Sequence, residues 1–354
     1  MVPNPPKLIL PIQYLRGIAA LMVVWHHGTE QMPGLAAYFP LRFGTSGVDV
    51  FFVISGFIMV MTTVGKSITP IDFIARRFIR VVPLYWVLTL ALVAGLLAAP
   101  SVFRSTVLTP GSLIQSLLFI PHLSPSRAGM VWPILVPGWT LNYEIFLYAV
   151  FAASLAFRQR LAVLASTMII LVAAGYLLGP FAHPIPKTFT DPILLEFVAG
   201  AVIGHLWIAG HVKLSWPASI IGMLVGIGLL VLRDSPSLAS YTKLVGAVLL
   251  IVGSLNVHML RWRNGLLLVL GDSSYSIYLT HIFALGAWRW IWTKLHLGTP
   301  DLPTGLLFMF LALTFCVIVG WLSYRWIETP VLNWMNGLLR KRRVAKVAVV
   351  PRNV

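Results

Sequence analysis

Arg16 and His27 have the most unusual setting in this chain, because both fall in one apolar stretch, residues 8–28. Eleven positions separate them, and eleven steps of about 100° return to nearly the same face of an α-helix. A rise of about 1.5 Å per residue places them roughly 16 Å apart along that helix. Such groups are costly inside a membrane and usually mark a site. The spacing predicts a cation and a general base at opposite depths of one site.

Each of these residues also has a plainer interpretation. Arg16 would then extend its guanidinium group to the cytoplasmic headgroups, and His27 would be an interfacial imidazole bonded to the backbone. The neighbouring His26 points about 100° away, so at most one of the two histidines shares the face of Arg16. The helical phase therefore favours His27 over His26 as the base.

Two carboxylates fall at an outer depth similar to that of His27. Asp49 opens the next apolar segment, where it either caps a helix or faces the site. Glu144 lies inside a later segment where no cap explains it, so its alternative is a paired structural charge. A carboxylate against His27 would hold its tautomer and stabilise the imidazolium formed in catalysis. The sequence leaves the choice between Asp49 and Glu144 open.

A basic cluster at residues 76–80 follows the second apolar segment. If this segment is helical, Arg77 and Arg80 share a face, and two converging guanidinium groups suit a phosphorylated ligand. The alternative is a cluster that only fixes membrane orientation.

The remaining polar residues of the apolar segments are expected to be packed bundle residues, namely Glu196, His205, His258 and His281. Their spacing fits no metal motif, so we expect no metal site. The absence of phosphate-loop, dinucleotide and nucleophile-elbow motifs leaves soluble ATP, dinucleotide and hydrolase chemistry without support.

The elements that position these residues are predicted to be membrane helices, so the expected fold is all-α and polytopic. Of the 354 residues, 58% are hydrophobic and only 10% are charged, against about 25% charged in soluble domains. The single cysteine allows no disulfide framework. A break at residues 271–274 is expected to start the main ninth span near Ser274. The ten candidate spans are residues 8–28, 48–65, 82–99, 138–157, 161–179, 192–209, 215–232, 244–260, 265–292 and 304–326.

The positive charges predict the orientation. With the N-terminus inside, inner segments hold 17 of the 26 lysines and arginines and outer segments hold eight. The net charge of +16 is therefore mainly an inside bias, with both termini cytoplasmic, and nucleic acid is not an expected partner. We expect a transmembrane domain over residues 1–335 and a basic tail over 336–354 lying against anionic lipid. The long outer loop, residues 100–137, is either a lid or a connector.

Together these segments resemble the acyltransferase 3 family of integral membrane acyltransferases. The resemblance covers most of the chain, and the compact form is most similar to exopolysaccharide O-acetyltransferases of the bacterial envelope. Thr140 and Asn142 stand where family members often have serine. The matching elements, in family order, are Leu15-Arg16 leading to His27, residues 47–58, Arg77-x-x-Arg80 leading to residues 83–86, and residues 139–144, 271–281 and 325–330.

The resemblance implies transfer of an acyl group, commonly acetyl from acetyl-CoA, to a carbohydrate hydroxyl at the inner membrane. It implies that His27 is the essential histidine and that Arg16, Arg77 and Arg80 serve the donor. Glu144 matches a characteristic acidic position of the family.

The expected mechanism has His27 take the proton of a hydroxyl group as that hydroxyl attacks the thioester. Asn142 and Tyr143 are expected near the oxyanion, and a covalent acyl-histidine relay is the variant. The competing function is a transporter or flippase of a glycan or lipid-linked intermediate, because intramembrane charges also mark transport paths. No inverted repeat supports it. A structural scaffold would leave the buried charges unexplained.

Overall fold

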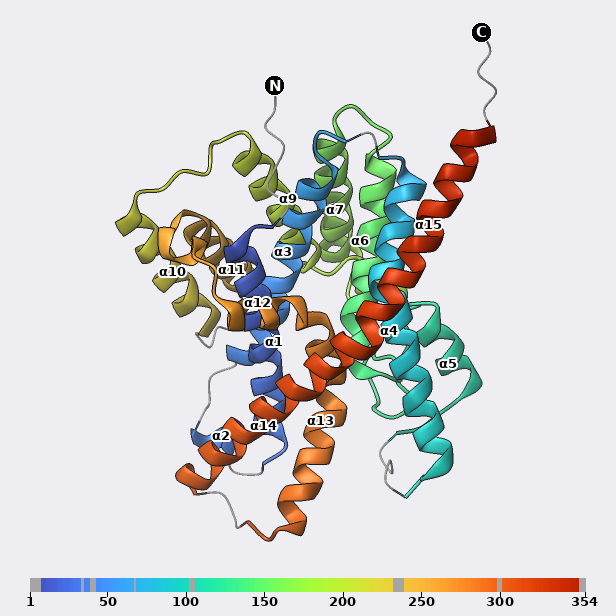
Figure 1. Ribbon diagram of the computed structural model, residues 1–354, viewed down its shortest axis with the longest axis vertical. Helices are drawn as coiled ribbons and strands as arrows, with labels where there is room; N and C mark the ends of the chain where they lie inside the picture. Colours follow the sequence, from blue (N-terminus) through green and yellow to red (C-terminus); the bar gives the residue numbers. More distant parts are fainter. Residues whose placement is uncertain are drawn as a thin grey trace.

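A computed structural model describes residues 8–32, 35–38, 43–66, 68–101, 106–231, 239–297 and 301–349. These residues contain helices and no β-strand (Figure 1). In chain order the α-helices are α1 (Leu10–Glu30), α2 (Leu35–Tyr38), α3 (Ser46–Thr63), α4 (Pro70–Ala98), α5 (Pro110–Leu117), α6 (Trp139–Ser154), α7 (Arg160–Leu178), α8 (Pro184–Phe189), α9 (Leu194–Ile208), α10 (Trp216–Val231), α11 (Ala239–Asn256), α12 (Gly265–Asp272), α13 (Ser274–Lys294), α14 (Leu302–Ser323) and α15 (Thr329–Val349).

The all-α, multi-pass character expected from the composition is present, but the count of ten spans is not confirmed. A helix overlaps each expected segment. By length and composition, however, five helices of the described chain could cross a membrane, or six if the bent pair α12 and α13 counts as one. α6 and α10 have only 16 residues each, short of the roughly 20 that a span needs. The cytoplasmic placement of the termini stays a prediction.

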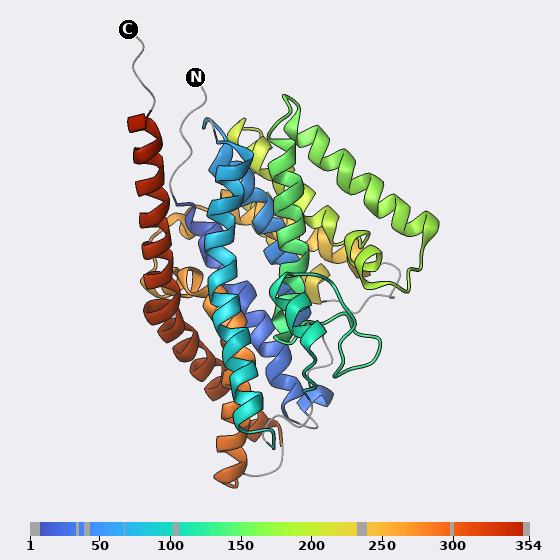
Figure 2. The same cartoon turned by 90° about the vertical axis from the view of Figure 1, so that its right-hand side faces the viewer.

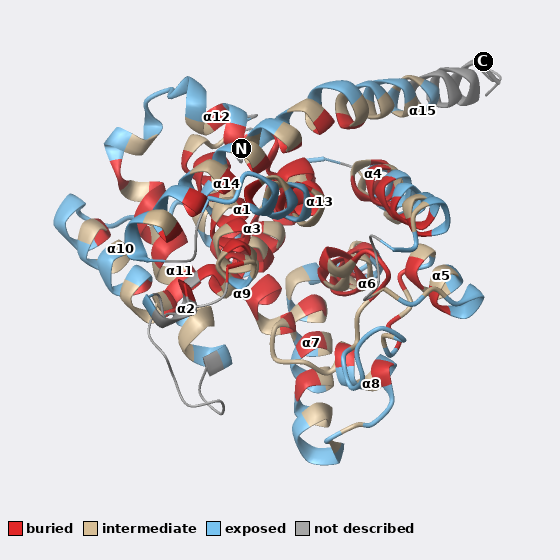
Figure 3. Ribbon diagram, turned by 90° about the horizontal axis from the view of Figure 1, so that it is seen from below, coloured by how far each residue is buried: buried red, intermediate tan, exposed pale blue. Residues whose placement is uncertain are grey.

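The helices form one bundle with α1, α3 and α13 near its centre (Figure 1). α10 and α11 lie on one flank, and α4 and α5 lie on the other. Seen from below, buried residues concentrate in the central helices, whereas α7 and α10 are largely exposed (Figure 3). An apolar exposed face is what a helix in contact with lipid requires.

α4 begins at Pro70, twelve positions before the span expected from hydropathy. The Thr69 hydroxyl accepts a hydrogen bond from the Asp72 amide at 3.1 Å, and Pro70 occupies the first helical position. These start signals place the basic cluster inside a helix rather than in a loop. Arg77 and Arg80 therefore share one helical face, while Arg76 is exposed.

The break expected at residues 271–274 is confirmed. α12 ends at Asp272, α13 starts at Ser274, and the two axes differ by 72°. Ser273 and Ser274 are fully buried, and their hydroxyl groups donate to the carbonyls of Val269 and Gly271. The bend turns the start of α13 into the bundle.

α14 and α15 form one long helical column along a flank of the bundle (Figure 2). A π-helical turn, Tyr324–Glu328, joins them. Such turns insert an extra residue and often occur at functional sites. α15 runs on to Val349, through the boundary at residue 335 that we predicted for the basic tail.

The long connection after α4 is packed against that helix. Tyr85 donates to the Ser116 carbonyl at 3.2 Å, and Trp86 donates to the Leu117 carbonyl at 2.8 Å. The Ile134 amide donates to the Ser116 hydroxyl at 3.0 Å. From residue 106 onward this segment is an ordered cover over α4, and the lid interpretation stays a prediction.

Candidate active site

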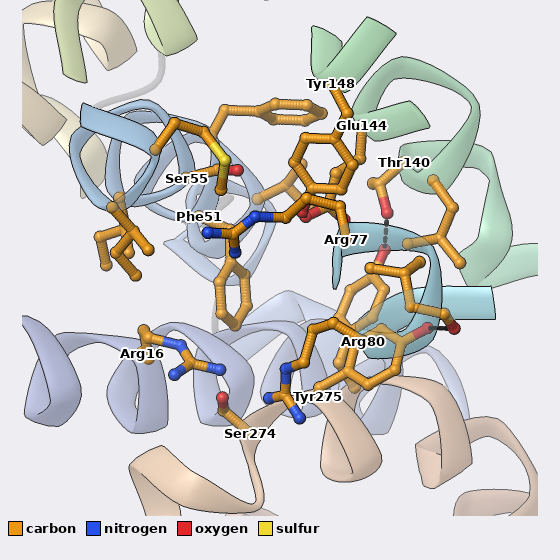
Figure 4. A pocket seen from close by; sticks show the side chains of 18 residues that line it. Arg16, Phe51, Ser55, Arg77, Arg80, Thr140, Glu144, Tyr148, Ser274 and Tyr275 are labelled. Atoms are coloured by element: carbon orange, nitrogen blue, oxygen red, sulfur yellow. Dashed lines mark hydrogen bonds between the residues drawn. The ribbon is translucent and has the colours of Figure 1, made fainter. Parts of the chain in front are cut away.

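The three arginines singled out from the sequence line one cavity of about 170 Å³, which we call the arginine cavity. Their guanidinium groups point into it from α1 and α4 (Figure 4). All three side chains are half-buried. The cavity is lined by Arg16, Val48, Phe51, Phe52, Ile54, Ser55, Ile58, Met59, Arg77, Arg80, Val81, Thr140, Leu141, Glu144, Tyr148, Ser274, Tyr275 and Tyr278.

Arg16 is held by a relay that begins one turn earlier in α1. Its guanidinium group donates to the Gln13 side chain at 3.1 Å, and the Gln13 amide donates to Asp272 at the end of α12. This orders Arg16 toward the cavity. The arrangement differs from the snorkelling alternative, in which the side chain would reach headgroups.

Arg77 and Arg80 have different partners. Arg77 donates to the Thr62 hydroxyl at 2.8 Å and lies 5.5 Å from the ring centre of Phe73. Arg80 is paired with Glu328, whose side chain is 1% exposed. The other Glu328 oxygen accepts a hydrogen bond from Ser276 at 2.6 Å. Arg80 thus has a neutralising carboxylate, and Arg77 has a neutral hydroxyl.

Glu144 belongs to the arginine cavity. It accepts a hydrogen bond from Tyr148, one turn later in α6. It lines this cavity together with Arg16, Arg77 and Arg80. It is therefore not the residue that orients His27, which was one of the two alternatives drawn from the sequence.

The buried start of α13 also faces this cavity, through Ser274. The first amides of a helix have no partners inside the helix, and its positive dipole end favours anions. Three arginines and a helix start make the cavity suited to an anionic ligand.

His27 lines a second space of about 480 Å³, which we call the histidine pocket. It shares two lining residues, Val48 and Tyr278, with the arginine cavity. The histidine pocket is lined by Val23, His26, His27, Gly44, Thr45, Val48, Asp49, Met130, Trp132, Val136, Pro137, Trp139, Asp191, Ile193, Glu196, Ser240, Lys243, Tyr278, His281 and Ile282.

The carboxylate beside His27 is Glu30. His27 Nδ1 lies 3.0 Å from Glu30 Oε2, and because a carboxylate only accepts, Nδ1 carries the hydrogen. The other ring nitrogen, Nε2, is then free of its proton and can act as a base. The His27 ring also stacks on His281, with 5.1 Å between ring centres. This geometry supplies an oriented imidazole.

His26 lines the same pocket, so the helical phase does not separate the two histidines as cleanly as we expected. His26 Nε2 lies 3.7 Å from the other Glu30 oxygen. The contacts distinguish them instead, because His27 has the shorter carboxylate contact and the stacking partner.

Asp49 lines the histidine pocket but pairs with Lys243 of α11, at 3.4 Å. Glu196 of α9 lines the same pocket. The cap interpretation does not apply, since the N-cap of α3 is Thr45 and Asp49 lies inside the first turn. Asn142 and Tyr143, expected near the oxyanion, line neither space.

One group of three described residues has the spacing for a metal ion. The ligand atoms of His26, His27 and Glu30 all lie within 4.8 Å of one another. In this structure His27 and Glu30 are hydrogen-bonded to each other, so the same three residues also fit an oriented general base. Our expectation that no metal is required stays a prediction.

Several residues of the site were not selected from the sequence. Glu30 follows the apolar stretch and looks like an ordinary exposed end, although its spacing of three from His27 is a helical contact distance. Glu328 and His281 stand in elements that carried the family resemblance, which was their available signal. No sequence pattern around Lys243 identifies it as a residue of the site.

The chain is similar in sequence to several known proteins. The chain is 40% identical over 300 residues to exopolysaccharide production protein ExoZ of Rhizobium meliloti, covering 82% of this chain and 90% of that protein. It is 31% identical over 197 residues to Protein 2 in picA locus of Rhizobium radiobacter, covering 49% of this chain and 98% of that protein. It is 26% identical over 326 residues to acyltransferase MdmB of Streptomyces mycarofaciens, covering 79% and 80% respectively.

No solved structure matches the chain significantly. The family model for the acyltransferase domain matches residues 10–324, which include both the arginine cavity and the histidine pocket. The chain therefore belongs to the acyltransferase 3 family.

Proposed function

We propose that this protein transfers an acetyl group from acetyl-CoA to a hydroxyl group of an envelope or extracellular polysaccharide, or of its lipid-linked precursor. It does so in the cytoplasmic membrane of a bacterium, with both termini in the cytoplasm. One observation carries the proposal. A cavity with three arginines and a pocket with an oriented histidine meet at Val48 and Tyr278.

The arginine cavity is the donor side. Coenzyme A is anionic and cytoplasmic, and its phosphates suit guanidinium groups and a helix start. At about 170 Å³ the cavity is smaller than a typical small-molecule site. It therefore accommodates the narrow pantetheine arm, with Arg77 and Arg80 toward the phosphates and the nucleotide outside.

The histidine pocket is the acceptor side. His27 Nε2 takes the proton of the hydroxyl group while the hydroxyl oxygen bonds to the thioester carbon. The carbon–sulfur bond then breaks, and the imidazolium returns the proton to the departing thiolate. Glu30 stabilises the imidazolium that forms between these steps.

The identity of the acceptor rests on the relatives. The name of ExoZ, 40% identical to this chain, refers to exopolysaccharide production. MdmB, which is named as an acyltransferase, shares the reaction class. A polysaccharide hydroxyl at the outer face is the acceptor class that agrees with both.

Transfer by purified protein tests the proposal. Full-length protein in detergent, supplied with labelled acetyl-CoA and the isolated polysaccharide, should label the polysaccharide without any membrane gradient. His27→Ala should lose at least about a hundredfold in rate, because general-base catalysis contributes that much. His26→Ala is the matched control and should lose less.

The outcomes separate the alternatives. Transport of glycan into vesicles without covalent labelling would establish a flippase instead. Normal turnover by His27→Ala would remove the role of His27. Recovery of labelled His27 after acid quenching without acceptor would favour the acyl-histidine relay over direct transfer.

A further inference from the structure

Ionisable side chains from three helices line the histidine pocket. Lys243 of α11 lies 3.4 Å from Asp49 of α3, and Glu196 of α9 lines the same pocket. Asp49 is 6% exposed and Glu196 is 1% exposed. Lys243 balances the charge of Asp49, so this ion pair is neutral as a unit.

Two buried polar atoms of the pocket have no partner among the described residues. One is Oε2 of Glu196, and the other is Nε2 of His281. His281 is fully buried, and its Nδ1 lies 2.5 Å from the Tyr278 carbonyl, to which it must donate. Nε2 therefore carries a lone pair. Buried polar atoms are nearly always satisfied, and both of these belong to residues that line the pocket, so a bound ligand with hydroxyl groups would satisfy them.

The pocket also has aromatic walls. Trp132 comes from the ordered cover after α5, and Trp139 is the first residue of α6. Indole rings provide flat apolar surfaces with a polar edge, which suits the C–H faces of a sugar ring. The volume of about 480 Å³ lies within the range of small-molecule sites.

We propose that Glu196 and His281 form the acceptor-binding subsite, and that this subsite selects uncharged sugars over uronates. The inference rests on the proposed function above, since it assigns the acceptor side of that reaction. Hydroxyl groups both donate and accept, so neighbouring hydroxyls of one sugar can satisfy Glu196 Oε2 and His281 Nε2 together.

The preference for uncharged sugars follows from the pairing of Lys243 with a carboxylate of the protein. Lys243 is the one lysine or arginine among the described residues lining the histidine pocket, and it is already paired with Asp49. Asp191 adds another carboxylate to the lining. A sugar carboxylate would have to displace Asp49 from Lys243 or remain unpaired in a buried site, and both are costly. An uncharged sugar meets neither cost.

Binding of matched glycosides to the full-length protein tests the proposal. Methyl glucuronamide and methyl glucuronate have the same shape and differ in charge, and methyl glucoside provides a fully hydroxylated probe. Titration followed by tryptophan fluorescence should show the amide binding at least about tenfold more tightly than the uronate. Glu196→Leu should weaken the binding of methyl glucoside about tenfold through the lost hydrogen bond, and Glu196→Gln should weaken this binding less.

Asp49→Asn tests the charge argument directly. It should release Lys243 and narrow the preference for amide over uronate. Asp301→Asn removes an exposed carboxylate that caps α14 and should leave all three affinities unchanged. Acetyl-CoA affinity, measured on every variant, reports folding at the separate arginine cavity.

Two results would overturn the inference: equal binding of amide and uronate by the unmodified protein, or full affinity of Glu196→Leu for methyl glucoside. Neither depends on turnover. Selective sugar binding without any acetyl transfer would instead refute the proposed function and leave the sugar subsite standing.

Discussion

A guanidinium group inside a helical membrane bundle needs a compensating partner, and the three site arginines find different ones. Arg16 is held by Gln13, and Arg80 is paired with Glu328. Arg77 donates to the Thr62 hydroxyl, and its guanidinium carbon lies 5.5 Å and 5.9 Å from the ring centres of Phe73 and Tyr148. Its Nε, moreover, is buried without a partner. Arg77 is thus the arginine with most capacity left for a phosphate.

Arg77→Gln should therefore weaken acetyl-CoA binding by at least about tenfold, the value of a charge-assisted hydrogen bond. The matched control is Arg76→Gln, since Arg76 is one position earlier in α4 but exposed. Equilibrium binding of labelled acetyl-CoA to purified protein measures both. Equal affinity of the two variants would reassign Arg77 to membrane orientation.

At the scale of elements, glycines determine which helices can meet. A Cβ atom on Gly56 of α3 would lie 1.9 Å from the Phe197 carbonyl oxygen, and one on Gly200 of α9 would lie 1.8 Å from that of Val53. Small residues at such contacts let membrane helices approach closely. Both helices contribute a carboxyl group to the histidine pocket, Asp49 from α3 and Glu196 from α9, so this close approach builds part of that pocket.

Gly56→Ala should force α3 and α9 apart and destabilise the protein by about 1–3 kcal/mol. Gly228→Ala in α10 is the control, because a Cβ atom there meets nothing within 4 Å. Thermal unfolding of the detergent-purified variants should show a lower midpoint for Gly56→Ala alone. An unchanged midpoint would mean that the two helices tolerate a wider spacing.

At the scale of the whole molecule, the proposed reaction requires that a thioester from one side of the membrane meet a hydroxyl group from the other side without being hydrolysed. The arginine cavity and the histidine pocket share Val48 and Tyr278, which therefore form a thin partition. The Tyr278 hydroxyl is bonded to Thr140 and to the Pro137 carbonyl, both at 2.9 Å. These bonds keep the ring in place between α13 and α6.

Tyr278→Ala should open the partition to water and raise the hydrolysis of acetyl-CoA in the absence of acceptor severalfold. Tyr278→Phe keeps the ring and should hydrolyse far less than the alanine variant. Release of free coenzyme A, followed with a thiol reagent, measures both. A low rate for Tyr278→Ala would show that other groups separate the two spaces.

The sequence by itself determined the local features of this protein. Hydropathy and helical periodicity located a helix at each expected segment, the break before Ser274, and Arg16 and His27 on one helix. These depend on residues a few positions apart, which the 3.6-residue period relates directly. The same signals placed the start of α4 too late, because four charged residues interrupt its first three turns and its start is set by a cap, Thr69.

Only the tertiary structure decided which helices meet, and with that the partners at the site. Glu144 lies with the arginines, Glu30 lies beside His27, and Asp49 pairs with Lys243. Asp49 and Lys243 are separated by almost two hundred positions, and their contact depends on how α3 packs against α11 and not on any local pattern. A buried charge shows in a sequence that it needs a partner, whereas the packing of the bundle selects which one it has.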